Sequence, residues 1–368
     1  MKRTLPLAAA GLVLVGCQHA PQQSHTVPEP PTTQVTHLAD SKADGDRVDL
    51  PPPAPADTAA RVAASTLVAS MSDDQRVNAL LATDHDARAD WHYVPRRRRG
   101  LAIGDMTDAQ RHDLNDLLQA GLSDAGYLKA MDIVWLESVL QELENRSDDY
   151  RDPGKYALLI FGDPADPDAA WGWRFEGHHL SLNFTYAPGA AGGIVTTPMF
   201  MGTNPAVVPA GLHAGKRILA DEYHRAFEFI ATLTDEQREA MMLANAPRDI
   251  ITGPGRERAI REPAGIAWGD LAPDAQQKLL ELIEAYAGRF QRDHRAAIDI
   301  PALHFAWAGS THPEEPHYYR IYCQDRFVIE YITQDGGVGH VHTVLHDLTD
   351  PLAQDLLRSH YEQHHAGQ

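Results

Sequence analysis

Residues 302–346 decide the fold, and they read ALHFAWAGSTHPEEPHYYRIYCQDRFVIEYITQDGGVGHVHTVLH. The stretch contains apolar runs rich in aromatic and β-branched residues, separated by Gly, Pro, Asp and Gln; the runs lie at 302–309, 317–323, 326–333 and 339–346. Runs of this kind bounded by turn residues predict β-strands.

A second block of predicted strands lies earlier in the chain, at 156–161, 171–175, 179–186 and 193–200. Helical patterns surround both blocks, near 72–83, 107–120, 123–146, 216–231, 234–245 and 271–297. Strand blocks that alternate with helix blocks indicate an α+β fold rather than a doubly wound sheet. We expect the two blocks, about 155–200 and 302–346, to meet in one mostly antiparallel sheet packed with several α-helices.

One short pattern recurs before several of the predicted helices. It reads MSDDQR at 71–76, MTDAQR at 106–111 and LTDEQR at 233–238, with a looser LAPDAQ at 271–276. Ser or Thr followed three residues later by Gln forms a capping box, and an apolar residue before the cap acts as a hydrophobic staple. We interpret the pattern as helix capping rather than as a true internal duplication.

The N-terminus has the features of an export signal. The basic pair Lys2-Arg3 precedes an apolar stretch, which ends in small residues and then Cys17. This order resembles a bacterial lipoprotein signal, which implies that residues 1–16 are removed and Cys17 is lipidated. The alternative is an ordinary secretory signal with an incidental cysteine.

A Pro- and Thr-rich segment follows Cys17. Residues 17–57 contain too few apolar side chains to form a core, so we expect a disordered tether before a single α+β domain over 58–368. No later apolar run is long enough to span a bilayer, which leaves the lipid on Cys17 as the membrane anchor. Gln18 rather than Asp after the cysteine favours the outer membrane of the cell envelope, if the organism has one.

The composition excludes some classes of partner. The chain of 368 residues has 51 acidic and 32 basic residues, a formal charge of -19, which argues against binding nucleic acid. Only two cysteines are present, so with Cys17 lipidated Cys323 has no disulfide partner. We expect Cys323 to be a buried, inert thiol.

Histidines supply the candidate metal ligands. Along a strand, side chains two residues apart share a face, which would place His340, His342 and His346 on one side. Two imidazoles on one face can bind one metal ion. Of the neighbours His178 and His179, only one can join such a site, and we favour His179 because it alternates with polar residues.

Carboxylates and arginines complete the candidate site. Glu330, one hairpin before the His-x-His strand, is a further candidate metal ligand, and Glu176 and Glu222 are candidate general bases. The run Arg96–Arg99 could receive an anionic group, or could pair with acidic residues nearby. Taken singly, each carboxylate fits a solvated or capping charge better than a metal ligand.

The chain resembles the domain of unknown function 3500 family from about Thr66 to Asp347. The resemblance is carried by WRFEGHHLSLN at 173–183, PMFMGTNP at 198–205, the helix with Glu222, and GHVHT at 339–343. Members of the family usually continue the last motif with Trp, Arg and Asp, whereas here Leu345-His346-Asp347 stands. They usually have Asn before His-x-His, whereas here Gly339 stands. The resemblance implies one fold and one histidine-rich cluster, and it assigns no substrate.

The preferred hypothesis is a metal-dependent hydrolase that acts on a small polar or anionic substrate. His340, His342, His179 and Glu330 would bind a divalent metal ion, which the sequence does not identify as zinc, iron or copper. Glu222 or Glu176 would be the base, and Arg96 would neutralise developing charge. The alternatives are a non-catalytic metal or small-molecule binding lipoprotein and an envelope scaffold.

Overall fold

The computed structural model describes residues 56–188, 193–291 and 302–358. Cys17 and nearly all of the segment 17–57 lie outside these ranges, so the lipid anchor and the tether stay predictions. Within the described ranges, no helix combines the length and the hydropathy that crossing a bilayer requires.

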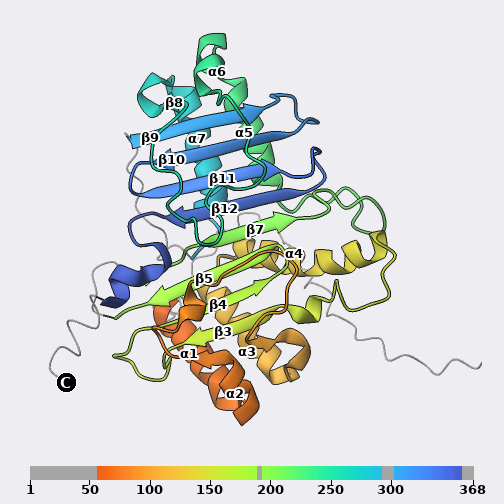
Figure 1. The fold of residues 1–368 in the computed structure, drawn as a ribbon, viewed down its shortest axis with the longest axis vertical. Helices are drawn as coiled ribbons and strands as arrows, with labels where there is room; N and C mark the ends of the chain where they lie inside the picture. Colours follow the sequence, from red (N-terminus) through yellow and green to blue (C-terminus); the bar gives the residue numbers. More distant parts are fainter. Residues whose placement is uncertain (1–55, 189–192, 292–301, 359–368) are drawn as a thin grey trace, which may run out of the picture. The chain divides into compact units, whose positions relative to one another are not determined.

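A single twelve-stranded sheet forms the centre of the fold (Figure 1). Its order is β1-β3-β4-β5-β7-β12-β11-β10-β9-β8, with β2 beside β3 and β6 beside β5, and only the β1–β3 pair is parallel. The strands are β1 Leu80–Leu81, β2 Leu101–Ala102, β3 Ala157–Phe161, β4 Trp171–Gly177, β5 Leu180–Tyr186, β6 Ile194–Val195, β7 Met199–Thr203, β8 Ile266–Ala267, β9 Leu303–Gly309, β10 His317–Cys323, β11 Phe327–Thr333 and β12 Val341–Asp347. The predicted α+β class is confirmed, and the two blocks meet where β7 pairs with β12.

Helices cover one face of this sheet. They are α1 Ala56–Ser70, α2 Asp73–Ala79, α3 Asp108–Gly121, α4 Asp124–Leu143, α5 Ala220–Ala231, α6 Asp235–Met241 and α7 Pro273–Ala287, with short 3-10 turns η1 Asp86–Arg88, η2 Ile103–Asp105, η3 Pro153–Lys155, η4 Trp268–Asp270 and η7 Pro351–Ala353. Apolar side chains of α1, α3, α4, α5 and α7 share one core with the sheet. Cys323 is buried in this core, as predicted.

Several predicted boundaries were wrong. The helix expected over 271–297 ends at Ala287, and the one expected from 216 begins at Ala220. The strand expected over 193–200 is divided into β6 and β7, and β7 continues to Thr203. Pro198 lies at the break, where its missing N–H cannot continue the ladder of hydrogen bonds.

The recurring sequence pattern caps helices as predicted. Ser72, Thr107 and Thr234 each accept a hydrogen bond from the backbone of the Gln three residues later, and that Gln side chain accepts one from the cap residue in return. In the looser fourth copy, Ala272 has no side-chain oxygen, and Pro273 begins the helix instead.

The pattern also marks a repeat of the whole element order, which the capping interpretation alone missed. In the first half, α1 and α2 precede β1, β2, η2, α3 and the strands β3, β4, β5 and β7. In the second half, α5 and α6 precede β8, η4, α7 and the strands β9 to β12, and a parallel bridge from Met242 to Trp307 takes the place of β1. Among the described residues, α4 occurs in the first half alone.

Equivalent contacts in the two halves support a duplication. The Gln75 side chain donates to Asp105 O over 3.1 Å, and the Gln237 side chain donates to Asp270 O over 2.7 Å. Both acceptors end a similar segment, LAIGD at 101–105 and IAWGD at 266–270. The two halves are therefore two copies of one unit, joined side by side through β7 and β12.

Gly100 and Gly265 precede these two segments, and both approach the sheet closely: a Cβ atom on Gly100 would lie 2.5 Å from Leu158 O. Gly265 has φ 86°, and a Cβ atom there would lie 2.0 Å from Phe305 O. Gly211, an exposed glycine between β7 and α5, serves as a comparison: it has φ 82°, but no atom lies within 4 Å of its Cβ position. Alanine in this conformation costs about 1–2 kcal/mol at Gly265 or Gly211, and of these two only Gly265 adds a backbone clash.

We therefore expect Gly265→Ala to lower the free energy of unfolding by at least about 1 kcal/mol more than Gly211→Ala does. Urea titrations of the two variants beside the parent protein measure this difference. Equal losses would show that β8 can move away from β9 at little cost.

Candidate metal centre

Three imidazole rings converge where the two halves meet. His340 Nε2 lies 2.8 Å from His179 Nε2 and 3.0 Å from His342 Nε2. His179 and His342 are buried, and His340 is partly exposed. One ligand atom from each ring lies within 4.8 Å of the others, so this group could hold a metal ion.

His179 reaches the site from a tight turn. It lies in the hairpin turn that connects β4 to β5, with φ 63°, rather than at the predicted start of the strand. Its backbone N–H donates to Tyr93 O over 2.8 Å, and its carbonyl accepts from Gly202 N over 2.8 Å. The choice of His179 over His178 agrees with the structure, but the turn, not strand alternation, directs its ring.

Glycine at position 202 leaves room for two of the rings. Gly202 pairs with His342 across β7 and β12. A Cβ atom on it would lie 3.1 Å from Cδ2 of both His179 and His342, and 2.9 Å from Val341 O. A side chain at this position would therefore push the imidazoles apart.

Carboxylates fix the protonation of two of the rings. Nδ1 of His340 lies 2.8 Å from Asp335 Oδ2, and Nδ1 of His342 lies 2.8 Å from Asp249 Oδ1. A carboxylate only accepts hydrogen bonds, so each Nδ1 carries the proton and each Nε2 of a neutral ring presents a lone pair. Two lone pairs 3.0 Å apart repel each other, whereas a cation between them would bind both.

The surroundings keep the rings of His179 and His340 neutral. Burial, followed by the nearby His178, His342 and His340, holds the pKa of His179 well below its usual value. Burial and His342 lower the pKa of His340 to about 4. Neutral imidazole is the form that binds metals.

Asp249 is held as an anion beside His342. Burial alone would raise its pKa, but hydrogen bonds from His342, the Ile250 backbone and the Tyr93 hydroxyl outweigh burial and lower the pKa. Gln334 Nε2 also donates to Asp249 Oδ1 over 3.1 Å.

Two loops in equivalent places of the two halves, 82–99 and 243–264, lie over the sheet face that carries His342 (Figure 1). Tyr93 of the first loop donates its hydroxyl hydrogen to Asp249 of the second over 2.9 Å. Trp91 Nε1 donates to Glu257 Oε1 over 2.8 Å, which joins the loops again. Sequence reasoning missed Tyr93 and Asp249, because neither lies in a metal-ligand pattern or near a histidine motif.

Glu330 anchors the second loop and does not lie in the three-histidine group. Its carboxylate accepts from the backbone N–H groups of Ile251 and Thr252 and from the Tyr318 hydroxyl, each over 2.8 Å, and from the Thr252 hydroxyl. His346 Nε2 donates to Thr252 O over 2.6 Å. Both residues hold the loop that carries Asp249, so their contribution to the site is indirect.

Glu176 lies beneath the first loop and is surrounded by guanidinium groups. Its oxygens lie 3.4 Å from Arg98 Nε, 3.3 Å from Arg174 Nε and 3.9 Å from Arg96 Nη2. The backbone N–H of His92 also donates to it, over 3.0 Å. The Glu176 carboxylate is thus engaged with protein groups around the first loop rather than free to face the histidines.

The arginine run mainly supports the loop. Arg98 Nη2 donates to the carbonyl oxygens of His92, Val94 and Gly177, which ties the first loop to the β4–β5 hairpin. Arg96, which is partly exposed, lies 3.0 Å from Asp90 Oδ1. The sequence left open whether these arginines receive an anionic group or pair with nearby acidic residues. Arg96 makes such a pair, with Asp90.

Glu222 is on the opposite face of the sheet from His342. Its backbone carbonyl accepts from the Tyr319 hydroxyl over 2.9 Å. Tyr319 pairs with Tyr331, and Tyr331 pairs with Thr343, so these three side chains share a face. Thr343 follows His342 in β12, and neighbouring residues of a strand point to opposite faces.

The Glu222 carboxylate is buried between two cations. Lys129 Nζ and Arg289 Nη2 donate to it, the latter over 2.8 Å. Burial would raise its pKa, but Arg289 and Lys129 outweigh burial and hold the pKa below its usual value. The structure does not bring Glu222 to the histidines, and the catalytic roles of Glu222, Glu176 and Arg96 stay untested predictions.

His178 packs directly on the site. Its ring stacks on that of His179 with 3.7 Å between centroids. Its Nδ1 contacts the buried Glu137 of α4 and lies 3.0 Å from Arg151 Nη1. These contacts fix the turn that directs His179.

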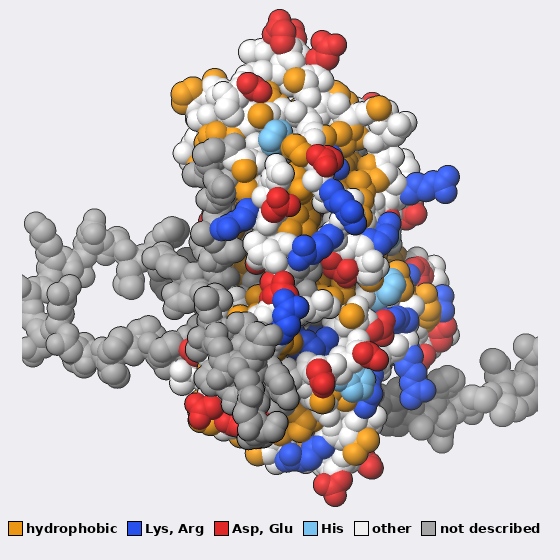
Figure 2. Space-filling view, turned by 60° about the vertical axis from the view of Figure 1, so that its left-hand side comes forward, with side chains coloured by type: hydrophobic (Ala, Val, Ile, Leu, Met, Phe, Trp, Pro, Cys, Tyr) orange, Lys and Arg blue, Asp and Glu red, His pale blue; other side chains and the backbone are white. Residues whose placement is uncertain are grey.

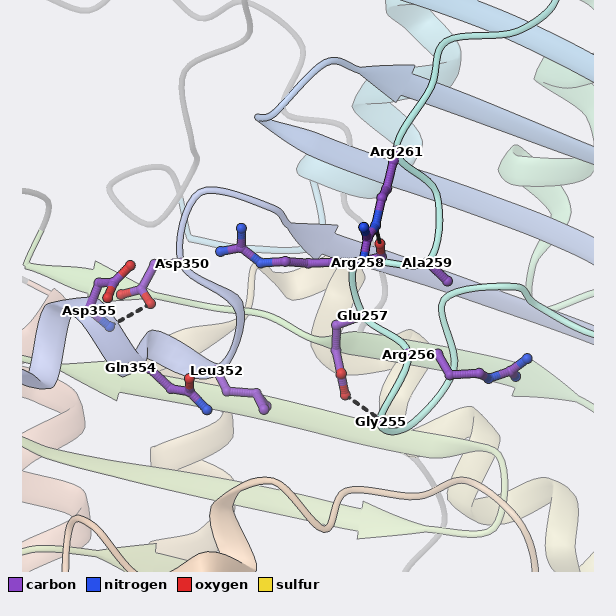
Figure 3. Close-up of a pocket in the computed structure, with 10 residues that line it drawn as sticks. All are labelled: Gly255, Arg256, Glu257, Arg258, Ala259, Arg261, Asp350, Leu352, Gln354 and Asp355. Atoms are coloured by element: carbon purple, nitrogen blue, oxygen red, sulfur yellow. Dashed lines mark hydrogen bonds between the residues drawn. The ribbon is translucent and has the colours of Figure 1, made fainter.

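Other groups of the described residues lie apart from this centre. His112, Asp113 and Asp116 form a second group with metal-ligand spacing on the surface of α3. A pocket of about 450 Å³ lies between the second loop and the segment after β12, and Figure 3 shows Arg258 extending from the loop toward the segment that carries Asp350. On the face shown in Figure 2, Lys and Arg side chains are set among Asp and Glu rather than gathered into one basic patch.

Comparison with known proteins gives one family. A family model described as "Protein of unknown function (DUF3500)" matches residues 54–351. No curated protein and no solved structure matches the chain.

His346 makes the stability of the fold sensitive to pH. The ring is fully buried beside Trp91, its Nδ1 has no hydrogen-bond partner among the described residues, and burial lowers its pKa to about 4. An unfolded histidine has a pKa of about 6.5, so between these values the unfolded chain binds more protons. The stabilisation is complete above about pH 6.5 and is lost as the pH falls toward 4.

We expect the free energy of unfolding to fall between pH 7 and pH 5 by about 2 kcal/mol more in the parent protein than in His346→Gln. Glutamine cannot titrate but can still donate to Thr252 O. Urea titrations of both metal-free proteins at the two pH values measure the difference, and parallel pH dependences would contradict it.

Proposed function

The chain belongs to the DUF3500 family, and we propose that it is a metal-binding protein whose centre consists of His179, His340 and His342. The observation that carries the proposal is the convergence of three Nε2 atoms, two of them on rings whose Nδ1 protons are held by carboxylates. Metal-binding histidines usually donate a hydrogen bond from the ring nitrogen that does not bind the metal, and this bond orients the ring and raises its basicity.

The donor set favours a borderline divalent cation. Three imidazole nitrogens suit zinc, copper or iron, whereas magnesium and calcium prefer oxygen ligands. Three protein ligands leave a further coordination position, which is typical of catalytic rather than structural zinc sites. His340 is the most exposed of the three, so a substrate would approach from its side.

We further propose that the centre hydrolyses a small polar or anionic substrate. A metal ion bound here would polarise the substrate and lower the pKa of a water molecule. The chain's own contribution is to orient the three rings and to exclude bulk water on the sheet side. In this proposal Glu330, Glu222 and Glu176 are not ligands or bases, because protein groups already occupy their carboxylates.

A non-catalytic metal-binding protein is the second candidate, and one observation favours it. The carboxylates nearest the rings, Asp249 and Asp335, are both engaged with Nδ1 atoms. Neither is free to act as a base while it holds its histidine. In either case we propose that a lipid on Cys17 anchors the protein in the cell envelope, facing the periplasm or the surface.

The first experiment is elemental analysis of the full chain, with Cys17→Ser to prevent lipidation and without a His tag, after incubation with zinc, copper, iron or manganese. We expect about one metal ion per chain in the parent and none in the double variant His340→Ala/His342→Ala. The double variant His112→Ala/Asp116→Ala, at the exposed group of α3, is the control and should retain the metal.

Hydrolysis of phosphate, carboxylate and sulfate esters is then screened with the metal-loaded parent protein and with the double variant His340→Ala/His342→Ala. Turnover in the parent alone supports the hydrolase, and stoichiometric metal without turnover supports the binding protein. A folded parent protein that binds none of the metals would contradict both the hydrolase and the metal-binding proposal. The remaining hypothesis would then be the envelope scaffold.

Asp249 should contribute to metal affinity without touching the metal. We expect Asp249→Ala to weaken metal binding about 10- to 100-fold, because His342 loses the acceptor that sets its tautomer. Asp335→Ala, which removes the more exposed of the two carboxylates, should cost less. Competition with a chromophoric chelator measures the metal dissociation constants of both variants. Equal losses of affinity would mean that burial of the carboxylate does not strengthen its effect on metal binding.

A further inference from the structure

A second cavity, of about 1170 Å³, lies beside the first loop, and none of the three histidines lines it. Its apolar wall residues are Ala82, Ala89, Gly162, Ala169, Ala170, Leu352 and Leu357. Leu352 and Gln354 line both this cavity and the smaller pocket of Figure 3, so they separate the two. The volume is sufficient for a small organic molecule.

Arg88 is the distinctive polar group of this cavity. Its Nη2 donates to the Thr185 hydroxyl and, over 3.3 Å, to Leu352 O, and its guanidinium lies 5.1 Å from the centre of the Phe161 ring. Nε and Nη1 have no hydrogen-bond partner among the described residues. No described carboxylate lies within 4.0 Å of Arg88, so the cation has no ion pair.

The charge of Arg88 is retained although its surroundings oppose it. Burial and the nearby Arg174 lower its pKa to about 10, while Asp350, beyond ion-pair distance, acts in the opposite direction; Arg88 is therefore protonated at neutral pH. A partly buried cation without a counter-ion in direct contact is costly, and a bound anion would reduce that cost. A free N–H group of the guanidinium can donate a charge-assisted hydrogen bond to one oxygen of a carboxylate.

We propose that this cavity binds an amphipathic monoanion, an apolar molecule with a single carboxylate group that pairs with Arg88. The apolar walls would cover the body of the ligand. Asp84 and Asp86 line the same cavity and are exposed, so they disfavour ligands with several negative charges. The site is independent of the metal centre, and its test does not require metal.

The test is isothermal titration calorimetry of the full chain with Cys17→Ser, using decanoate, decanol and decylamine as probes. We expect decanoate to bind at least ten-fold more tightly than either of the others. In Arg88→Gln the affinity for decanoate should fall to that for decanol, while decanol changes less than two-fold. Arg358→Gln is the matched control, because Arg358 lines the cavity but pairs with Asp355.

Equal affinities for decanoate and decanol in the parent, or no binding of decanoate, would overturn the proposal, as would an unchanged preference in Arg88→Gln. If Arg88→Gln does not fold, Arg88→Lys keeps the charge and should keep part of the preference for decanoate. Ala169→Leu narrows the cavity and should weaken all three probes alike. Unchanged affinities for all three probes in that variant would place the ligand elsewhere and overturn the proposal.

Discussion

The pairing of β7 with β12 is the contact on which the rest of the structure depends. It joins two copies of one unit into a continuous sheet, and it places Gly202 opposite His342. The absence of a side chain at Gly202 lets two imidazoles approach the backbone, and its N–H holds the His179 carbonyl. The same ladder of hydrogen bonds therefore closes the fold and sets the spacing of the histidine rings.

The loops above this junction convert a group of histidines into an ordered site. Tyr93 and Asp249 come from loops in equivalent places of the two halves, and their hydrogen bond links the loops directly over His342. Buried polar groups stabilise a fold only when all of their hydrogen bonds are made. Glu330 and His346 meet that requirement beneath the second loop, where they bind Thr252. The ring of His342 is thus held through contacts that extend across three strands.

The sequence predicts those parts of the fold that depend on local periodicity. Capping boxes at Ser72, Thr107 and Thr234 locate helix starts, and the alternation around His340 and His342 identifies the strand that carries ligands. The contribution of Asp249 depends on the path of a loop, which has no periodic signal. Glu330 was expected at the metal because it lies one hairpin away, but its partners come from a segment about 80 residues earlier, a contact that spacing does not encode.

The duplication explains why neither half could form the centre alone. His179 comes from a hairpin of the first half, whereas His340 and His342 come from the last hairpin of the second. In the antiparallel register, Met201 pairs with Thr343 at the middle of the contact, so Phe200 occupies in β7 the place that His342 occupies in β12. The two copies share a scaffold but differ in the side chains at this position. The three rings meet only once the halves have docked, so the integrity of the centre depends on the junction between β7 and β12 rather than on the stability of either half.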